Sequence, residues 1–267
     1  MVAWGCCTSA DNCAVVEAAG YDYLEPAMVA LHPELGEDGL RAARAALAGC
    51  HLPVAALNQL LPATIQIVAP PVDEFAVEQY LGVATRWAAK LGADVIVFGS
   101  RGARNAPPDM PVAQVRERLR WFLGIAARHA RASGVTVAIE PLCRPGCNTI
   151  NTVAEAVELV REVGQPEIRV LADLFHMAED GEPLDDLLAA GPYLRHVHVP
   201  VPGVPELQTQ GRQYDYPGFF RALRTIGYDG RISVEDNGRR FRAFGSEIRP
   251  VLAYLQDTWD RARGETV

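Results

Sequence analysis

Strand-like and helix-like segments alternate along the 267-residue chain, and this rhythm constrains the fold more than any other feature of the sequence. One strand and one helix recur roughly every 30 residues, the length of a βαβ unit. Short β-branched or apolar runs predict strands at Val2–Cys6, Tyr21–Glu25, Val54–Asn58, Val95–Phe98, Val135–Glu140, Ile168–Ala172, Arg195–Val199 and Arg231–Glu235. Helical periodicity predicts helices at Ala10–Ala19, Gly39–Gly49, Asp73–Leu91, Val112–Ser133, Thr152–Val163, Leu184–Ala190, Tyr216–Ile226 and Ile248–Arg261. Because the strand runs are continuously apolar, we expect a parallel sheet covered by helices.

Eight strand–helix units in a chain of this length fit a closed (β/α)₈ barrel, a TIM barrel, as a single domain over residues 1–267. A doubly wound open sheet is the alternative, but no G-x-G-x-x-G sequence follows the first strand. Three segments share one pattern, in which a glycine just past a helix precedes a strand that ends in a carboxylate: Gly20–Glu25, Gly134–Glu140 and Gly227–Glu235. In a TIM barrel the active site lies at the C-terminal ends of the strands, where those carboxylates stand.

Composition removes several classes of function. Apolar residues make up 49% of the chain and the net charge is −8, with no polybasic run, so nucleic-acid binding is disfavoured. Lys90 is the only lysine, and it falls at the end of a helix, away from the strand C-termini, so a Schiff-base mechanism is excluded in a barrel. The longest apolar stretches are far short of the roughly 20 residues that a membrane span needs. The N-terminus shows no secretory signal, and we expect a cytoplasmic protein.

The six cysteines give no sign of a metal or disulfide framework. None of them forms a C-x-x-C pair, and their spacing matches neither a zinc ribbon nor a disulfide scaffold. We therefore expect a reduced chain.

Four consecutive predicted strands deliver Glu140, Asp173, His198 and Glu235 to one rim of the barrel. Unpaired, these carboxylates would repel one another across a small space, and a divalent cation removes that cost. Three carboxylates and one imidazole favour Mn²⁺ or Mg²⁺, ahead of Co²⁺ or Zn²⁺. The sequence therefore predicts one divalent metal ion at these four residues.

Two further histidines lie near this predicted site. His196 and His198 are two residues apart on one strand, so both side chains point to the same face, about 7 Å apart. His196 then lies a layer deeper, where a hydrogen-bonded supporting role is expected. His176 follows Asp173 by three residues, in the predicted loop after the sixth strand, where it reaches a substrate oxygen or simply faces solvent.

Four segments of the chain carry a combination of motifs that is typical of one family: Ile139–Leu142 with Asn148–Thr152, Leu171–Met177, His196–His198 and Tyr228–Glu235. Together they resemble the xylose isomerase-like TIM-barrel superfamily, and most closely its sugar isomerase and epimerase branch with D-tagatose 3-epimerase and hydroxypyruvate isomerase. The resemblance implies that Glu140, Asp173, His198 and Glu235 hold the metal, and that the residue at His176 contacts a carbohydrate substrate. It also implies that Glu140 and Glu235 act as the acid–base pair. Such a pair transfers a proton beside the carbonyl of a bound α-hydroxycarbonyl, through an enediolate.

The chain departs from that branch in the residues that read the substrate. A substrate-contacting glutamate of the epimerases falls on Gly146, and a family arginine falls on Val204, which Arg212 replaces only if its loop folds back. Simple ketohexose 3-epimerisation is thereby in doubt.

Other residues are expected to line the pocket. Arg101 and Arg104 follow the fourth strand, where an arginine would bind an acidic or phosphorylated substrate, or else pair with a local carboxylate. Of the two, Arg104 is the predicted substrate contact. Trp4 and Cys6 at the end of the first strand, and Asn58 at the end of the third, complete the predicted pocket.

Two other activities remain open at this point. A metal-dependent lyase of the inosose dehydratase type begins with the same proton abstraction as an isomerase, so product analysis must separate them. A metal hydrolase of the endonuclease IV type needs more histidines than the six in this chain. The sequence leaves the number of subunits open, with a homo-oligomer as one option.

Overall fold

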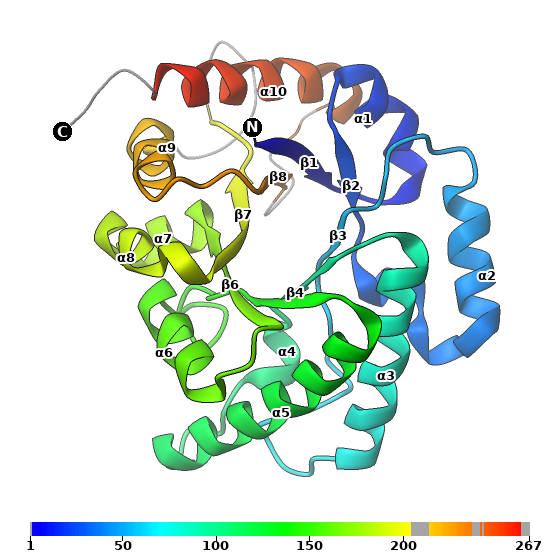
Figure 1. Ribbon diagram of the computed structural model, residues 1–267, viewed down its shortest axis with the longest axis vertical. Coiled ribbons are helices and arrows are strands. Elements are labelled where there is room, and N and C mark those ends of the chain that lie inside the picture. Colours follow the sequence, from blue (N-terminus) through cyan, green and yellow to red (C-terminus); the bar gives the residue numbers. More distant parts are fainter. Residues whose placement is uncertain (1, 204–213, 237–240, 242, 263–267) are drawn as a thin grey trace.

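The core of the protein is a barrel of parallel strands enclosed by a ring of helices (Figure 1). The computed structural model describes residues 2–203, 214–236, 241 and 243–262. Within these residues eight strands form one sheet, and every pairing in it is parallel. They are β1 (Ala3–Cys7), β2 (Tyr23–Glu25), β3 (Ala56–Leu57), β4 (Val95–Phe98), β5 (Thr136–Ile139), β6 (Ile168–Asp173), β7 (Leu194–Pro200) and β8 (Arg231–Glu235).

The sheet closes almost completely on itself. Its strand order runs from β2 through β1, β8, β7, β6, β5 and β4 to β3, and isolated parallel bridges join Leu24 to Val54 and Ala27 to Asn58 across the seam. The prediction of a TIM barrel is therefore confirmed. Strand β3 is shorter than predicted, because Val54 and Asn58 at the predicted ends make only isolated bridges to the segment of β2.

Helices follow the strands around the outside, as Figure 1 shows. They are α1 (Cys13–Ala19), α2 (Gly36–Leu47), α3 (Glu74–Leu91), α4 (Arg101–Arg104), α5 (Val112–Ser133), α6 (Val153–Val163), α7 (Leu174–Asp180), α8 (Leu184–Ala190), α9 (Tyr216–Thr225) and α10 (Phe244–Arg261). Short 3₁₀ turns lie at Ala10–Asn12, Met28–Leu31, Pro33–Leu35 and Gly191–Tyr193. The glycines of the repeated pattern take the left-handed conformation after helices, with φ of +96° at Gly20, +69° at Gly134 and +70° at Gly227.

The two faces of each strand meet different surroundings. Side chains such as Trp4, Leu24, Ile96 and Phe98 point outward and pack with the helices in one large apolar core. Inside the barrel, strands β3 to β6 contribute a small apolar cluster: Ala56, Val95, Val97, Ala138 and Leu171. Strands β2, β7 and β8 instead point buried polar groups inward: Tyr23, Glu25, His196, His198 and Ser233. This polar half of the interior lies beneath the predicted site.

Helix α7 corrects one prediction. It begins directly after Asp173, whose carboxylate accepts a hydrogen bond from the Phe175 backbone N–H at 2.8 Å and so caps the helix. His176 therefore lies on the first turn of a helix, not in a loop. Since a helix fixes the direction of its side chains, His176 is held more firmly than a loop residue would be.

The cysteines correct a second prediction. Cys13, at the start of α1, and Cys50, just after α2, form a disulfide with their Cα atoms 5.5 Å apart. The expectation that all six cysteines are free was therefore wrong. The pair was not visible in the sequence because 37 residues separate its members, and only the fold brings the start of α1 next to the segment after α2.

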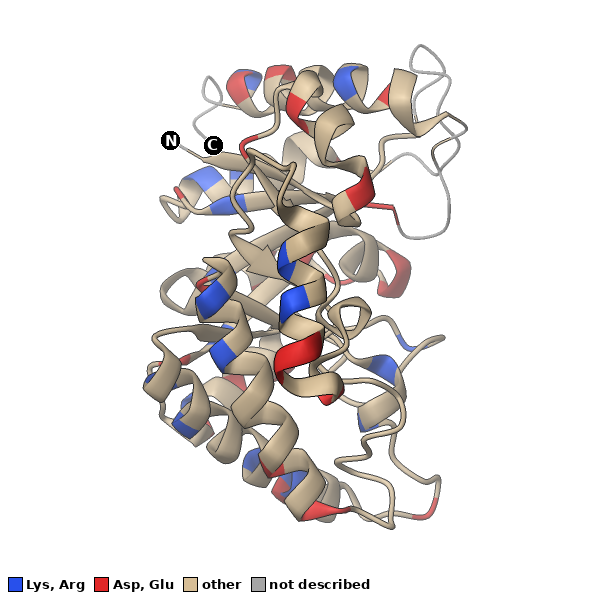
Figure 2. Cartoon of the chain, turned by 90° about the vertical axis from the view of Figure 1, so that its right-hand side faces the viewer, with Lys and Arg blue, Asp and Glu red and all other residues tan. Residues whose placement is uncertain are grey.

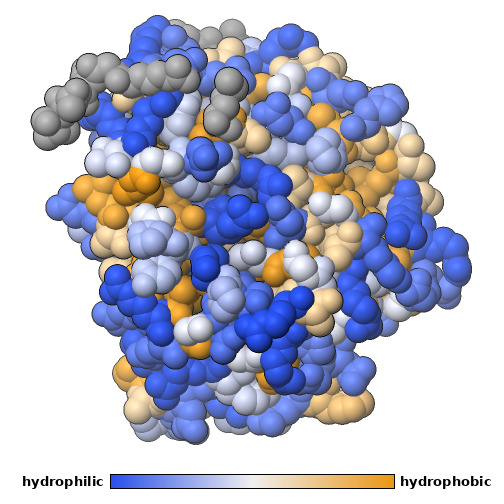
Figure 3. Space-filling view, in the orientation of Figure 1, coloured by the Kyte–Doolittle hydropathy of each residue, from blue (hydrophilic) through white to orange (hydrophobic). Residues whose placement is uncertain are grey.

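The outer surface carries mixed charges and small apolar patches. Figure 2 shows acidic and basic residues interspersed over the helices, and on the face drawn in Figure 3 hydrophilic side chains separate the apolar ones. Lys90 belongs to this surface, at the end of α3, and pairs with Glu37 at 3.0 Å. Among the described helices none combines the length and the apolar character needed to cross a membrane.

Candidate active site

Four side chains converge at the C-terminal ends of strands β5 to β8. Glu140, Asp173, His198 and Glu235 each offer one atom to a group whose members all lie within 4.8 Å of one another. Asp173 stands opposite His198 in the β6–β7 register, and Glu235 ends β8. Asp173 and His198 are almost fully buried, whereas the side chain of Glu235 is 18% exposed. The structure thus brings together the four residues that the sequence singled out.

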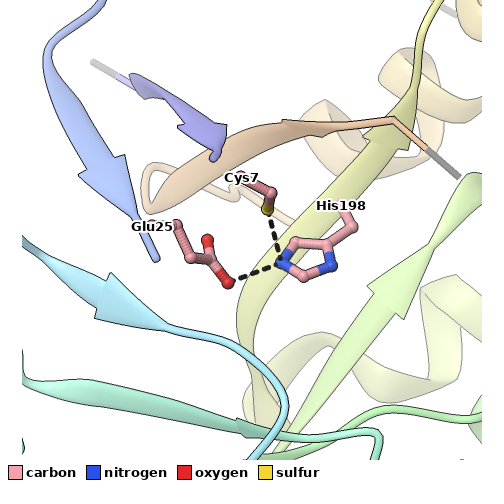
Figure 4. A group of neighbouring side chains, drawn as sticks. All are labelled: Cys7, Glu25 and His198. Carbon is pink, nitrogen blue, oxygen red and sulfur yellow. Dashed lines mark hydrogen bonds and ion pairs between the residues drawn. The ribbon is translucent and has the colours of Figure 1, made fainter. Parts of the chain in front are cut away.

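His198 connects this group to the barrel interior. Its Nδ1 lies 3.3 Å from Glu140 Oε1 and 3.3 Å from Glu235 Oε2, yet it is buried without a hydrogen-bond partner. Its Nε2 lies 2.9 Å from Glu25 Oε1 and 3.8 Å from Cys7 Sγ. Figure 4 shows both of these contacts on one ring nitrogen, with the other nitrogen pointing away. Because Glu25 is a carboxylate, Nε2 donates to it, and the lone pair of Nδ1 faces the acidic group.

Glu25 is the anchor of a buried network beneath the site. Besides the bond from His198, its Oε2 accepts hydrogen bonds from His196 Nε2 at 2.7 Å and from Ser233 Oγ at 2.5 Å. Tyr23 extends the network through a 2.7 Å contact to Ser233. Cys7, Glu25 and His198 also lie close enough to hold a metal ion, but the carboxylate is already satisfied by three donors, so we assign it to holding the ring. His196 has the supporting place that its position in the strand predicted.

Burial and crowding shift the acidities of the group. Burial, together with the neighbouring charges of Glu235 and Glu140, raises the pKa of Asp173 to about 6. Burial works against ionisation of Glu140, but the His198 ring outweighs it and lowers the pKa of that carboxyl. Burial also opposes charge on His198, yet Glu25 and the other acidic neighbours raise its pKa well above the usual range. A proton on His198 and a cation between the carboxylates are therefore two ways to relieve the same repulsion.

A cavity of about 450 Å³ opens over these groups. Its wall includes Glu140, Glu235, His176 and Phe175, together with residues that follow β3 and β4: Gln59, Leu61, Pro62, Ala63, Gly99, Ser100, Arg101 and Gly102. The Nδ1 of His176 accepts a hydrogen bond from the Cys143 backbone N–H at 3.1 Å, so its proton is on Nε2. That nitrogen lies 3.7 Å from Asp173 Oδ2 and is placed to donate into the cavity.

The alternation of side chains along β1 corrects two predictions, those for Trp4 and Cys6. Trp4 packs edge-on against Phe220 of α9, with ring centroids 6.0 Å apart, and Cys6 is buried in the same outer core. Neither residue lines the cavity described above. Cys7, one residue further, points inward to His198 instead. A shift of one residue along a strand exchanges its two faces, which is why the neighbouring cysteine was chosen wrongly.

The structure places the two arginines after β4 differently from the prediction. Arg104 is fully buried below the cavity, where its guanidinium donates to the backbone oxygens of Phe98 at 3.0 Å and Glu140 at 2.8 Å. It supports the ends of β4 and β5 and does not line the cavity, contrary to its prediction as a substrate contact. Arg101 does line it.

The remaining predicted positions are divided between two places. Asn58 lines a second cavity, which shares Gln59 and Glu235 with the first, and its buried Oδ1 has no hydrogen-bond partner in the described part of the chain. Its role as a substrate contact stays a prediction. Val204 and Arg212 lie outside the described residues.

Comparison with known proteins agrees with this architecture. A family model described as "Xylose isomerase-like TIM barrel" matches residues 13–258. The ketose 3-epimerase of Arthrobacter globiformis is 27% identical over 82% of this chain and 74% of its own length. The 2-oxo-tetronate isomerase of Cupriavidus necator is 30% identical over 70% of this chain and 72% of its own length.

Solved structures resemble the whole fold. The D-allulose 3-epimerase of Methylomonas sp., in complex with D-allulose, superposes with a TM-score of 0.78 at 22% identity, over 96% of this chain and 97% of its own. The IOLI protein, whose crystal structure has a zinc atom bound, gives 0.73 at 19% identity, over 99% and 100%. The family match, the relatives and the barrel agree: the chain belongs to the xylose isomerase-like TIM barrel family and is an enzyme of the isomerase or epimerase kind.

Proposed function

We propose that this enzyme moves a proton at the carbon next to a carbonyl, converting one α-hydroxycarbonyl compound into its isomer or epimer through an enediolate. Glu140, Asp173, His198 and Glu235 hold one divalent ion, with Mn²⁺ or Mg²⁺ favoured by the three carboxylates. When bound, such an ion polarises the carbonyl and stabilises the negative charge that develops on the oxygens. The substrate is a small carbohydrate or a related hydroxy-keto compound.

The observation that carries this proposal is the buried Nδ1 of His198. It has no hydrogen-bond partner, and it lies 3.3 Å from carboxylate oxygens of both Glu140 and Glu235. A buried nitrogen left unpaired costs about 1–3 kcal/mol. The Nδ1 of His196 is also buried and unpaired, but the Nδ1 of His198 lies next to two carboxylates that can complete a cation site. A cation coordinated by that nitrogen and the surrounding carboxylates removes the cost for His198, and the donor set fits a metal of intermediate hardness.

Glu140 and Glu235 are suited to the two proton transfers. They follow strands β5 and β8, which β6 and β7 separate in the sheet, so their carboxylates enter the cavity from different sides. One removes the proton from the substrate and the other returns one, on the opposite face or on the neighbouring carbon. Both carboxylates line the cavity and can therefore reach a bound substrate.

His176 is suited to orient the substrate. Its Nε2–H faces the cavity because the Cys143 backbone holds its Nδ1 as the acceptor. A neutral imidazole donor of this kind can hold a substrate oxygen without adding a charge. Helix α7 fixes the position of His176 relative to Asp173, so a substrate bound to His176 has a defined position relative to the carboxylates.

Deuterium exchange tests the reaction. Metal-loaded enzyme is incubated in D₂O with ketoses, inososes and hydroxy-keto acids, and recovered substrate and product are analysed by mass. Deuterium bonded to carbon is expected in both the substrate and the product. Product that forms without deuterium would argue for a hydride shift or hydrolysis, and loss of water from the product would identify a lyase.

Two variants test the acid–base pair. Glu140→Gln and Glu235→Gln are each expected to abolish exchange and turnover while binding some metal, because each keeps the size of the side chain but loses its proton chemistry. Glu182→Gln is a control, since Glu182 lies outside the cavity and accepts a hydrogen bond from the Val153 backbone N–H. Activity near that of the wild type in either active-site variant would contradict the two-base scheme.

A further inference from the structure

The segment that follows strand β4 places a positively charged side chain, Arg101, at the wall of the active-site cavity. Phe98 ends β4, Gly99 and Ser100 turn the chain, and Arg101 begins the short helix α4. Any side chain at 99 would collide with the Glu140 carboxylate, so glycine is required there. Ser100 holds the left-handed conformation at φ +38°, and its Oγ accepts a hydrogen bond from the Leu61 backbone N–H at 2.9 Å. This turn places Arg101 in the wall of the cavity that Glu140, one of the acid–base pair of the proposed reaction, also lines.

The guanidinium of Arg101 rests on the backbone of the loop after β5. A Cβ built on Gly146 would lie 2.7 Å from Arg101 Cζ and 2.9 Å from its Nη2, so a side chain at 146 would have to displace the guanidinium. Gly146 closes a turn by donating its N–H to the Cys143 carbonyl at 2.9 Å. Two loops 45 residues apart thus fit together only because one contributes an arginine and the other has no side chain.

Among the described residues Arg101 has no carboxylate partner for its charge. In the described part of the chain no hydrogen bond or ion pair joins it to a carboxylate. Arg144, in the same loop as Gly146, differs in this respect because it pairs with Asp180 at 2.9 Å. Arg101 is exposed at the cavity wall, together with His176, Glu140 and Glu235. A guanidinium kept unpaired next to carboxylates is placed to meet an anion that arrives with the substrate.

We infer that Arg101 forms an anion-binding subsite, and that the substrate carries a carboxylate or a phosphate beside its α-hydroxycarbonyl group. This inference rests on the proposed function and adds the class of substrate. A negatively charged substrate would otherwise be repelled by Glu140 and Glu235, so a fixed cation in the same wall offsets that repulsion. A neutral sugar offers hydroxyl groups only, and these gain little from a guanidinium fork.

Matched ligand pairs test the subsite by affinity rather than turnover. Hydroxypyruvate and dihydroxyacetone differ by a carboxylate in place of a hydroxymethyl group, and D-fructose 6-phosphate and D-fructose differ by a phosphate. Binding to the Mn²⁺-loaded enzyme is measured by calorimetry for both pairs. At least one anion is expected to bind about 100-fold tighter than its neutral partner, since bonds between a guanidinium and an anion are among the strongest in proteins. The preferred pair then identifies the anion as carboxylate or phosphate.

Two variants and a control assign that preference to Arg101. Arg101→Gln is expected to reduce the affinity ratio to near one, and Gly146→Ala to reduce it about tenfold by displacing the guanidinium. Arg144→Gln is the control, because its guanidinium is already paired, and it should keep the wild-type ratio. A ratio near one in the wild type for both pairs, or a ratio that survives in Arg101→Gln, overturns the subsite.

The same variants separate this inference from the proposed function. Deuterium exchange confined to neutral ketoses and unchanged in Arg101→Gln would leave the proton-transfer function standing and remove the subsite. If no compound exchanges deuterium but anion binding still depends on Arg101, the proton-transfer function is refuted and the anion-binding subsite is supported.

Discussion

Replacing Glu25 by glutamine tests how the barrel interior prepares the metal site. Glu25 is not one of the four residues of the predicted metal site, but its Oε1 accepts the Nε2–H of His198 at 2.9 Å, and its Oε2 accepts hydrogen bonds from His196 and Ser233. The amide of glutamine offers one oxygen and one NH₂ group. If the oxygen keeps His196 and Ser233, the NH₂ faces His198 Nε2, and two donors meet.

His198 can resolve that conflict only by moving its proton from Nε2 to Nδ1. Nδ1 then points an N–H at Glu140 and Glu235 and no longer offers a lone pair to a metal ion. The lost charge-assisted hydrogen bond is worth about 1.5–3 kcal/mol, and each 1.4 kcal/mol is about a factor of ten in affinity. We therefore expect Glu25→Gln to bind Mn²⁺ about 100-fold more weakly, within the range known for residues that orient metal ligands.

The assay is calorimetric titration of the metal-free protein with Mn²⁺, with circular dichroism to confirm that each variant is folded. Tyr23→Phe is the matched control, since it removes the hydroxyl that contacts Ser233 but leaves the Glu25–His198 bond intact. We expect that control to bind Mn²⁺ with nearly wild-type affinity. A folded Glu25→Gln protein that binds Mn²⁺ as tightly as the wild type would refute the reasoning, because His198 would then not depend on Glu25 for its tautomer.

Three further variants probe the rest of the structure. Burial, together with the charges of Glu235 and Glu140, raises the pKa of Asp173 to about 6, so the neutral Asp173→Asn variant should melt without metal at or above the wild-type temperature. Asp173→Asn should also lose the stabilisation by Mn²⁺, and retained stabilisation would remove Asp173 from the ligands. Burial raises the pKa of Glu182 from 4.5 to about 8, so the folded state favours the protonated carboxyl and loses stability as the pH rises from 4.5 to 8. The neutral Glu182→Gln variant lacks this loss, so its melting temperature should rise relative to that of the wild type over this pH range, and a constant difference would contradict the assignment. Leu171→Ala leaves a cavity in the barrel interior and should lower the free energy of unfolding in urea by about 3 kcal/mol. Leu188 on α8 is 38% exposed, so Leu188→Ala should lower it little, and equal effects would contradict the assigned core.

The sequence predicted what depends on local pattern. The bounds of β4, α5, α8 and β8 agree with their predicted ranges residue for residue, because each segment is a clear apolar run or has a clear period, with a glycine, a proline or a polar turn beside it. The carboxylates and the imidazole of the site could also be predicted from the sequence, since each lies at or near the C-terminal end of a strand, and the barrel topology brings those ends to one rim. Glu25 ends a strand in the same way, but it was read only as part of the repeated pattern because its partners lie 171 and 173 residues away.

The errors share a different cause, which is the direction in which a side chain points. Cys6 and Cys7 are neighbours of one type, and the pleat of β1 alone decides that Cys7 meets His198 while Cys6 packs under the helices. Arg101 and Arg104 are both arginines of one helical turn, yet Arg104 turns inward to backbone carbonyls and Arg101 outward to the cavity. That division depends on Gly146, because only a residue without a side chain leaves room for a guanidinium there. A glycine that looks like a lost substrate contact in the sequence is therefore, in the folded protein, the space that one arginine needs to enter the active site.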